Sequence, residues 1–403
     1  MMDSLKDNDQ CSTESILGPQ SESGSMSKNK GGLLPSAESS LLSTGSKRSS
    51  DCQVDEISSK KRSSDAPEGG NQEEFLHVIV DEVSVLSSSI SELKASVAGA
   101  GRSPSLAIDC EGVKLSRDGK LTLLTVATPT KVFLYDVLKL GQSVFENGLK
   151  EILEDASVEK LMFDCRNDSD ALYHLYNVNL AGVLDVQLLE VVSRKEQPAP
   201  FVRHNQRLRH LTSQPAKGAE ILKGYLKCLD LYVNDPSVTD MKRKGSNLLN
   251  LSSGLWEKRP LTEDMINYAC VDAIAMFKMF ASFKAKPFFE KNLNRVRGAS
   301  KLYADYQREV DKRAHDNYES NRYLPLTILL FLEFGEMRAS GTKKCDGCKR
   351  WFDSQFVFKK NPLCIVCNRV MQEMNNREHR EHLFDDVEEY GYDSPNEDNL
   401  YCW

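Results

Sequence analysis

The sequence predicts an α/β fold, in which a mixed sheet with flanking helices is followed by a small module held together by cysteines. The first observation is a group of three apolar, partly β-branched segments with short connections, at 106–111, 121–127 and 132–135, which is typical of an antiparallel meander. The second is the alternation of strands and helices that follows, which adds helix-covered strands to the sheet. The third is a pair of Cys-x2-Cys motifs within 345–367, which is typical of a metal-stabilised module.

The elements after the meander follow from changes in periodicity. Helical spacing of apolar residues alternates with short apolar runs, which predicts helix, strand, helix and strand at 144–154, 160–163, 168–176 and 183–184. A longer helix begins after Pro260, because Thr262 is a candidate N-cap and the next two residues are acidic, which favours a first turn. We expect this helix to continue to about Phe280.

Composition indicates a soluble, intracellular protein. The 403 residues are 40% hydrophobic, which is enough for a substantial core beside polar tails. No stretch reaches the roughly 20 apolar residues that cross a bilayer, and the most apolar run, 324–334, predicts a buried helix. The acidic start does not resemble a secretory signal, so the eleven cysteines predict free or metal-bound thiols and no disulfide framework. We therefore expect no membrane partner, and a net charge of −7 does not by itself exclude nucleic acid.

Both ends of the chain are predicted to be tails. Residues 1–75 hold 18 serines and few aromatic residues, too little apolar surface to offset the entropy of ordering, so we expect disorder. Two basic clusters within 47–62 resemble a bipartite nuclear import signal, although such patches are also common in disordered tails, and nucleus and cytoplasm both stay open. Residues 76–103 are expected to be a connecting helical segment, and 373–403 an acidic tail.

Acidic residues and one tyrosine are spaced so that their side chains share a face of the predicted strand or helix. Asp109 and Glu111 are two apart on the first strand of the meander, so their side chains leave the same face. Two like charges side by side cost free energy unless a divalent cation neutralises them, which favours a Mg²⁺ or Mn²⁺ site, although acidic strand ends at a solvent edge are common. Tyr268 and Asp272 are four apart on the long helix, where a phenol and a carboxylate reach the same site.

Together with Asp168, these four residues resemble the DEDDy exonucleases, the RNase D-like family. Gly112 after Glu111 and the segment 259–262 (Arg-Pro-Leu-Thr) are also similar to that family, and the resemblance covers about residues 104–285. It implies an RNase H-like domain over 104–285 that hydrolyses nucleic acid from single-stranded 3′ ends, RNA more than DNA. It further implies that two Mg²⁺ or Mn²⁺ ions are held by four carboxylates, and that Tyr268 orients the attacking water; the implied catalytic residues are Asp109, Glu111, Asp168, Tyr268 and Asp272.

The sequence departs from this family in two places. Phe163 stands where many relatives carry histidine, which puts fine positioning of the site in doubt more than activity. A long insertion at about 192–255 holds basic residues that could contact phosphates or could be incidental charges on a solvated surface. These candidate nucleic-acid-binding residues are Arg203, Arg207, Arg209, Lys242, Arg243 and Lys244.

A second metal site is predicted near the C-terminus. Two Cys-x2-Cys pairs are separated by 15 residues, and four converging thiolates satisfy tetrahedral zinc without an open position, so one structural Zn²⁺ is expected at Cys345, Cys348, Cys364 and Cys367. The module is expected over 341–372, joined to the exonuclease domain by a helical linker over 286–340. Basic and aromatic residues around the cysteines suit nucleic acid, a small core or a protein partner equally.

Two classes of function follow. The favoured one is an active exonuclease, because none of the implied metal ligands is missing from the sequence. The alternative is a catalytically inactive scaffold that uses the same fold to bind RNA or protein.

Overall fold

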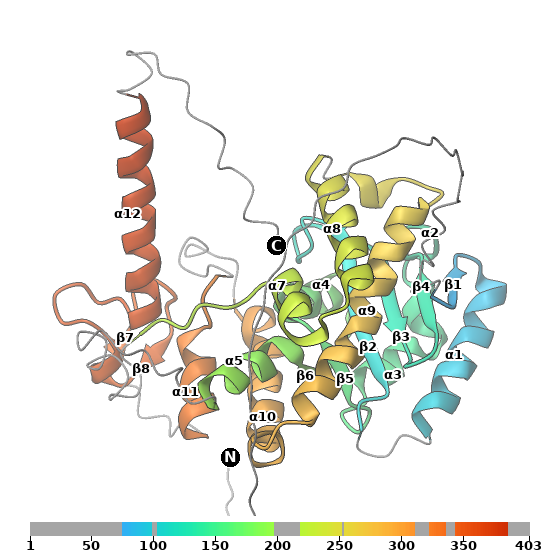
Figure 1. Ribbon diagram of the computed structural model, residues 1–403, viewed down its shortest axis with the longest axis horizontal. Coiled ribbons are helices and arrows are strands. Elements are labelled where there is room, and N and C mark those ends of the chain that lie inside the picture. Colours follow the sequence, from blue (N-terminus) through green and yellow to red (C-terminus); the bar gives the residue numbers. More distant parts are fainter. Residues whose placement is uncertain are drawn as a thin grey trace, which may run out of the picture. The chain divides into compact units, whose positions relative to one another are not determined.

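The computed structural model describes residues 75–98, 103–196, 218–251, 254–310, 322–335 and 343–385. The predicted N-terminal tail, its import signal and the end of the predicted acidic tail lie outside these residues and stay predictions. At the centre is a six-stranded sheet with the order β1-β4-β3-β2-β5-β6 (Figure 1). The strands are β1 His77–Val80, β2 Leu106–Val113, β3 Lys120–Ala127, β4 Val132–Tyr135, β5 Lys160–Met162 and β6 Val183–Asp185.

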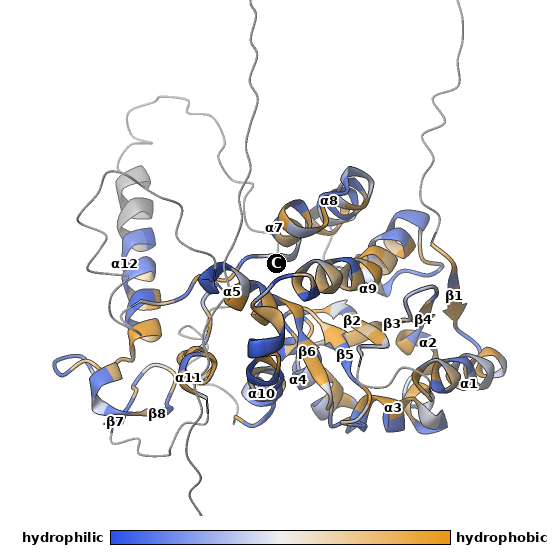
Figure 2. Cartoon of the chain, turned by 60° about the horizontal axis from the view of Figure 1, so that its bottom comes forward, coloured by the Kyte–Doolittle hydropathy of each residue, from blue (hydrophilic) through white to orange (hydrophobic). Residues whose placement is uncertain are grey.

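The predicted mixed α/β sheet is confirmed. Strands β2, β3 and β4 form the antiparallel meander, while β5 pairs in parallel with β2, and β6 in parallel with β5. The strands are mostly hydrophobic, as Figure 2 shows by colour. Almost every residue of β3 and β4 is buried, which is expected for strands covered by helices on their faces.

The segment 76–103 contains more than a connecting helix. Helix α1 Val83–Ala98 is present, but β1 precedes it and pairs in parallel with β4, with His77 opposite Val132. The prediction missed β1 because a four-residue apolar run has no periodicity of its own, and its pairing partner lies more than 50 residues away in the chain. The sheet therefore begins before residue 104.

Helices pack around this sheet (Figure 1). The predicted helix at 144–154 is divided, because Gly148 has a φ of +106° and interrupts it, leaving a π-helical turn at Phe145–Leu149 before α3. The helices up to the long helix are α2 Val137–Leu140, α3 Lys150–Glu154, α4 Arg166–Tyr176, α5 Val186–Glu196, α7 Tyr225–Cys228 and α8 Pro236–Leu251, with a second π-helical turn at Leu229–Val233 and a 3₁₀ turn at Leu255–Glu257.

Helix α9, Glu263–Lys284, lies against β2 and β3 and carries the second half of the predicted site. Thr262 is its N-cap, as predicted, since its side chain accepts a hydrogen bond from the backbone N–H of Met265 at 3.4 Å. The entry to the helix is fixed by Arg259, whose guanidinium binds both carboxylate oxygens of Asp136 at 2.5 and 2.8 Å and the carbonyl of Trp256. Among the described helices, α9 alone is long and apolar enough to cross a membrane by length and composition, and half of its apolar window is buried, as in a core helix.

The predicted linker over 286–340 is part of the main domain. Helix α10, Phe289–Arg308, packs on α4 and β6: the Ser300 hydroxyl accepts a hydrogen bond from the backbone N–H of Asp185 at 2.9 Å, and the Tyr303 hydroxyl donates to Gln187 at 2.9 Å. The prediction missed this because α10 is polar on average, and only contacts with distant elements reveal which of its faces is buried. The predicted buried helix at 324–334 is α11, Leu326–Phe334, which packs on α10.

The cysteine module follows α11. It consists of the two-stranded sheet of β7 Lys343–Lys344 and β8 Trp351–Phe352, a 3₁₀ turn at Ser354–Phe356, and α12 Ile365–Asp385. The predicted acidic tail from 373 onward therefore begins as the continuation of α12. Arg350 connects the module to α10, because its guanidinium stacks 3.7 Å from the ring centroid of Tyr306 and donates to the Tyr306 carbonyl at 3.0 Å.

Candidate active site

Strand β2 presents Asp109 and Glu111 on one face, as its alternation predicts. Its pairing with β3 shifts between Glu111 and Gly112, which is a β-bulge placed directly after the second carboxylate. A β-carbon on Gly112 would lie 1.8 Å from the carbonyl oxygen of Lys120, so only glycine permits this close approach. Gly112 therefore shapes the strand where it presents Glu111.

Asp272 of α9 completes a group of three carboxylates. Side-chain oxygens of Asp109, Glu111 and Asp272 all lie within 4.8 Å of one another, which is the spacing expected of ligands that share one cation. Two residues of this group come from β2, and the third comes from a helix more than 150 residues later in the chain. The packing of α9 on β2 brings the two halves of the predicted set together.

Asp168 lies beside this group but outside it. On the first turn of α4, it accepts a hydrogen bond through Oδ1 from the backbone N–H of Cys110 at 3.1 Å, between the two β2 carboxylates. Burial, followed by repulsion from the nearby Asp109, raises the pKa of Asp168 well above its ordinary value. The structure thus gathers three of the four predicted carboxylates and anchors the fourth to the backbone that carries two of them.

Burial dominates the electrostatics of the site. Desolvation, with repulsion from Asp272, raises the pKa of Asp109 to about 7. Burial, followed by repulsion from Asp109, raises the pKa of Glu111 well above its ordinary value, and burial likewise raises the pKa values of Asp168 and Asp272. Carboxylates crowded in this way need an added positive charge to be ionised together.

The residues fit a divalent cation. Oδ1 of Asp272 is buried and has no hydrogen-bond partner among the described residues, which is costly for a carboxylate oxygen unless something else binds it. It belongs to a group whose ligand atoms are all oxygens, the donors that Mg²⁺ and Mn²⁺ prefer. An ion in this group would bind the orphaned oxygen and offset the repulsion between the carboxylates.

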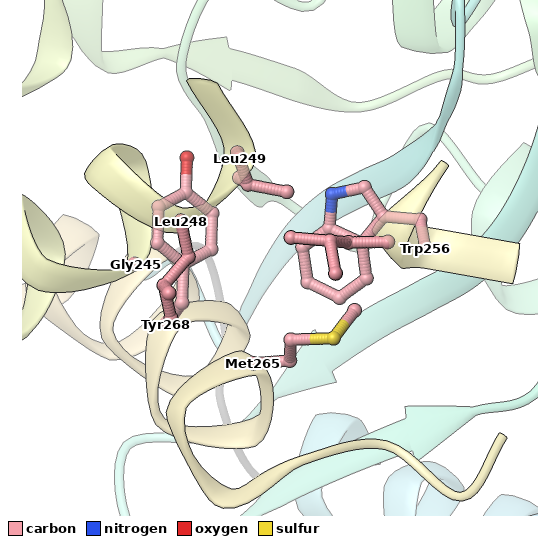
Figure 3. Close-up of a pocket in the computed structure, with 7 residues that line it drawn as sticks. Gly245, Leu248, Leu249, Trp256, Met265 and Tyr268 are labelled. Carbon is pink, nitrogen blue, oxygen red and sulfur yellow. The ribbon is translucent and has the colours of Figure 1, made fainter. Parts of the chain in front are cut away.

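Tyr268 lies one turn before Asp272 on α9, with its ring packed against α8. A narrow apolar crevice at this place is lined by Tyr268, Met265, Trp256 and residues of α8 (Figure 3). A β-carbon on Gly245 would come within 2.2 Å of Cδ2 of Tyr268, and the Trp256 ring centroid lies 6.0 Å from that of Tyr268. Burial raises the pKa of the Tyr268 hydroxyl well above its ordinary value, so at neutral pH it is a hydrogen-bond donor and not a base.

The predicted basic cluster at 242–244 is paired within the chain. Arg243 binds Asp240 at 2.6 Å, and Lys244 binds Asp264 at 3.2 Å. Lys242 is 8% exposed and its ammonium is paired with Asp272, so the structure places it inside the site and not on an open phosphate-binding surface. The other candidates, Arg203, Arg207 and Arg209, lie outside the described residues.

Tyr225 is a site residue that the sequence did not single out. Its hydroxyl donates to the backbone carbonyl of Asp272 at 2.5 Å, which fixes α9 at the position of the carboxylate. Its ring meets that of Phe163, the residue that departs from the family pattern, edge to face with the centroids 4.9 Å apart. Tyr225 belongs to no motif with recognisable spacing, so only the packing identifies it, and the packing gives Lys242 a place other than the one predicted.

The four cysteines of the module also converge. The sulfurs of Cys345, Cys348, Cys364 and Cys367 lie within 4.8 Å of one another and are buried, and none forms a disulfide. Two backbone amides donate to them, that of Cys364 to Sγ of Cys345 at 3.0 Å and that of Cys367 to Sγ of Cys364 at 3.4 Å. Amide–sulfur bonds stabilise thiolates, and four thiolates around zinc stand about 3.8 Å apart, so the cluster fits a closed tetrahedral site.

The fold and the group of carboxylates are those of a domain of the 3′-5′ exonuclease class. The family model described as 3′-5′ exonuclease matches residues 78–286. The chain therefore belongs to the 3′-5′ exonuclease family, and the matched region includes β1, which agrees with a sheet that starts before residue 104.

Several known proteins resemble part of this chain. The piRNA biogenesis protein EXD1 of Xenopus laevis is 37% identical over 118 residues, which is 28% of this chain and 27% of the relative. The human protein of the same name is 29% identical over 168 residues, 42% of this chain and 30% of the relative. The chain thus spans less than a third of the length of these two relatives.

A solved structure shares the fold. The RNase D of Trypanosoma brucei, crystallised as a GMP complex, superposes with a TM-score of 0.51 and 19% identity over 69% of this chain and 83% of that protein. The predicted RNase D-like exonuclease domain is thereby confirmed as a fold and family.

Proposed function

We propose that this chain is a metal-dependent exonuclease that hydrolyses phosphodiester bonds from the 3′ end of nucleic acid. One observation carries the proposal: in a domain of the 3′-5′ exonuclease family, oxygens of Asp109, Glu111 and Asp272 lie within 4.8 Å of one another. Such a group of crowded acids, two half-buried and one buried, is unfavourable by itself and suits divalent ions.

The chain's own residues have separate tasks in this proposal. Asp109, Glu111 and Asp272 would hold the ions, and Asp168, whose carboxylate is bonded to the Cys110 amide between the two β2 carboxylates, would be the fourth ligand. A pair of Mg²⁺ or Mn²⁺ ions supplies positive charge to the attacking water and to the leaving 3′ oxygen. The Tyr268 hydroxyl stays protonated and donates a hydrogen bond that orients the water.

RNA is the proposed substrate, with DNA as the weaker one. The similar proteins from frog and human are named for piRNA biogenesis, an RNA process. Single-stranded 3′ ends are the proposed form of the substrate, because the three carboxylates lie where α9 packs on β2 and are half-buried or buried.

The cysteine module is proposed to bind one structural zinc ion. Four buried sulfurs and two amide donors leave no position for a substrate, so the metal stabilises the fold of the module and takes no part in hydrolysis. The contact between Arg350 and Tyr306 joins this module to the helix that packs behind the exonuclease sheet.

A second candidate function is an inactive scaffold that binds RNA without cleaving it. The observation that favours it is the ion pair between Lys242 and Asp272, because an ammonium at a metal ligand opposes metal binding. Incubation with labelled RNA and DNA strands separates the two candidates.

The test is incubation of the purified chain with 3′-labelled and 5′-labelled strands of RNA and DNA in Mg²⁺, Mn²⁺ or EDTA. We expect metal-dependent shortening from the 3′ end, faster on RNA, and no activity in Asp109→Asn or Glu111→Gln. Glu146→Gln is the matched control, since it removes a carboxylate from an exposed turn. Wild-type protein that binds the RNA in all three conditions and shortens no strand would establish the scaffold instead.

A further inference from the structure

Lys242 is held inside the carboxylate site by three groups. Its ammonium pairs with Oδ2 of Asp272, and Nζ lies 3.7 Å from the ring centroid of Tyr268 and 5.0 Å from that of Tyr225. The faces of aromatic rings carry negative charge, so two rings and a carboxylate form a good site for a cation. In this chain the cation is a side chain of the protein itself.

The packing of α8 carries Lys242 to this position. Lys242 and Gly245 are three residues apart and therefore lie on the same face of α8. Gly245 lies so close to Tyr268 that a β-carbon would come within 2.2 Å of Cδ2. Because glycine lets the helix approach α9, the lysine on the same face reaches Asp272. The ion pair is therefore a consequence of how α8 and α9 pack.

The two carboxylate oxygens of Asp272 differ in their contacts. Oδ2 is paired with Lys242, whereas Oδ1 is buried without a hydrogen-bond partner among the described residues. Asp272 is also one of the three carboxylates whose oxygens lie within 4.8 Å of one another. A divalent ion bound there would share this carboxylate with the ammonium, and two cations that close repel each other in a buried site.

We infer that the Lys242 ammonium is a built-in competitor of divalent ions at Asp272, so that full metal loading of the site requires Lys242 to withdraw. This inference rests on the proposed function, because it concerns the same carboxylates. The charges agree with it. The carboxylates of Asp109, Glu111, Asp168 and Asp272 carry a charge of −4 when ionised, which two divalent ions alone would neutralise; with the Lys242 ammonium present the charge is −3, so one ion leaves −1 and a second makes the site positive by +1. Lys242 thus favours one ion in the resting site, and a second becomes favourable when a substrate phosphate adds negative charge.

The test is calorimetric titration of the full chain with Mn²⁺ in the absence of nucleic acid, together with the shift of Tm that Mn²⁺ produces. Lys242→Met keeps the length of the side chain and its packing against the two rings while removing the charge. We expect Lys242→Met to bind Mn²⁺ about ten-fold more tightly than wild type, or to bind an additional ion, since a nearby repulsive charge is gone. The Mn²⁺-dependent rise in Tm should increase accordingly.

Two controls define the result. Lys301→Met removes the same charge from an exposed lysine that pairs with the buried Asp305 on α10, and should leave Mn²⁺ binding unchanged. Lys242→Arg keeps the charge and should bind Mn²⁺ like wild type. If Lys242→Met fails to fold, Lys242→Gln takes its place as the neutral variant.

The outcomes separate this inference from the proposed function. Equal or weaker Mn²⁺ binding by the neutral variants, with wild-type binding that Asp109→Asn abolishes, would overturn the competition and leave the metal site in place. Absence of binding in wild type and in both neutral variants would overturn the metal site as well. Binding that appears only when Lys242 is neutral would support the competition in its strongest form.

Discussion

Gly245 of α8 lies directly against the ring of Tyr268 of α9, so close that an added β-carbon would stand 2.2 Å from Cδ2 and 2.8 Å from Cβ of the tyrosine. Rotation of the tyrosine side chain cannot relieve this contact, because the position of Cβ is fixed by the α9 backbone. The distance between the two helices, and with it the position of Lys242 relative to Asp272, depends on this glycine.

Gly245→Ala should therefore force α8 away from α9. We expect the free energy of unfolding to fall by about 1–3 kcal/mol, the usual cost of overpacking. Fluorescence of Trp256, which is 3% exposed and close to Tyr268, should shift to longer wavelength as the crevice opens. Gly224→Ala is the control, since an added β-carbon there meets nothing within 4 Å. Equal urea-unfolding midpoints for the two variants would contradict the packing argument.

The stability of the metal-free protein should fall as the pH rises from about 4 to about 7. Burial, with repulsion from Asp272, raises the pKa of Asp109 to about 7. A carboxyl group whose pKa is higher in the folded than in the unfolded state binds its proton more tightly when folded, so its contribution to stability is present at low pH and is lost through this window. Urea unfolding in EDTA across the window measures the slope.

Asp109→Asn should make that slope shallower and stabilise the metal-free protein at neutral pH by on the order of 1 kcal/mol. A residual slope should remain, because burial also raises the pKa of Asp185, outside the carboxylate group, to about 6. Mn²⁺ should raise the Tm of wild type but not that of Asp109→Asn. Identical pH profiles for the two proteins in EDTA would show that Asp109 is not the titrating group.

Tyr268→Phe should lower turnover by a factor on the order of 10², with little change in substrate affinity. The substitution removes only the hydroxyl, which is the donor proposed to orient the water, and leaves the ring packed against α8. Steady-state kinetics on a labelled oligonucleotide separate kcat from KM. A rise in KM with unchanged kcat would assign the hydroxyl to substrate binding.

Cys364→Ser should unfold the cysteine module locally while exonuclease activity on a short single strand persists. The module is small and its four sulfurs are gathered around one point, so metal binding contributes on the order of 10 kcal/mol to its folding. Elemental analysis should find about one zinc per wild-type chain and none in the variant.

Cys228→Ser provides the matched control for that experiment. Cys228 is a buried thiol outside the cluster, so this variant bears the general cost of a buried hydroxyl while keeping its zinc. Proteolytic cleavage within 343–385 should increase for Cys364→Ser alone. A Cys364→Ser protein that is inactive on all substrates would show that the module and the exonuclease domain fold as one unit.

Local sequence determined much of this protein. The alternation in β2 placed Asp109 and Glu111 on one face, the helical spacing placed Tyr268 and Asp272 on one side of α9, and Thr262 capped that helix as predicted. The spacing of the cysteines predicted a cluster, which the structure contains. Each of these features depends on a few neighbouring residues whose geometry is set by the regular backbone, so a pattern suffices to predict it.

Tertiary structure decided the rest. β1 became an edge strand by pairing with β4, α10 became part of the core, and Asp168 bonded to the backbone of β2, because each depends on a partner far away in the chain. The clearest case is Lys242, which the sequence predicts as a surface contact for phosphate and which lies instead between two aromatic rings and the carboxylate of Asp272. Burial of a charge depends on what surrounds it in space, and in this chain the glycine one turn further along α8 allows that burial.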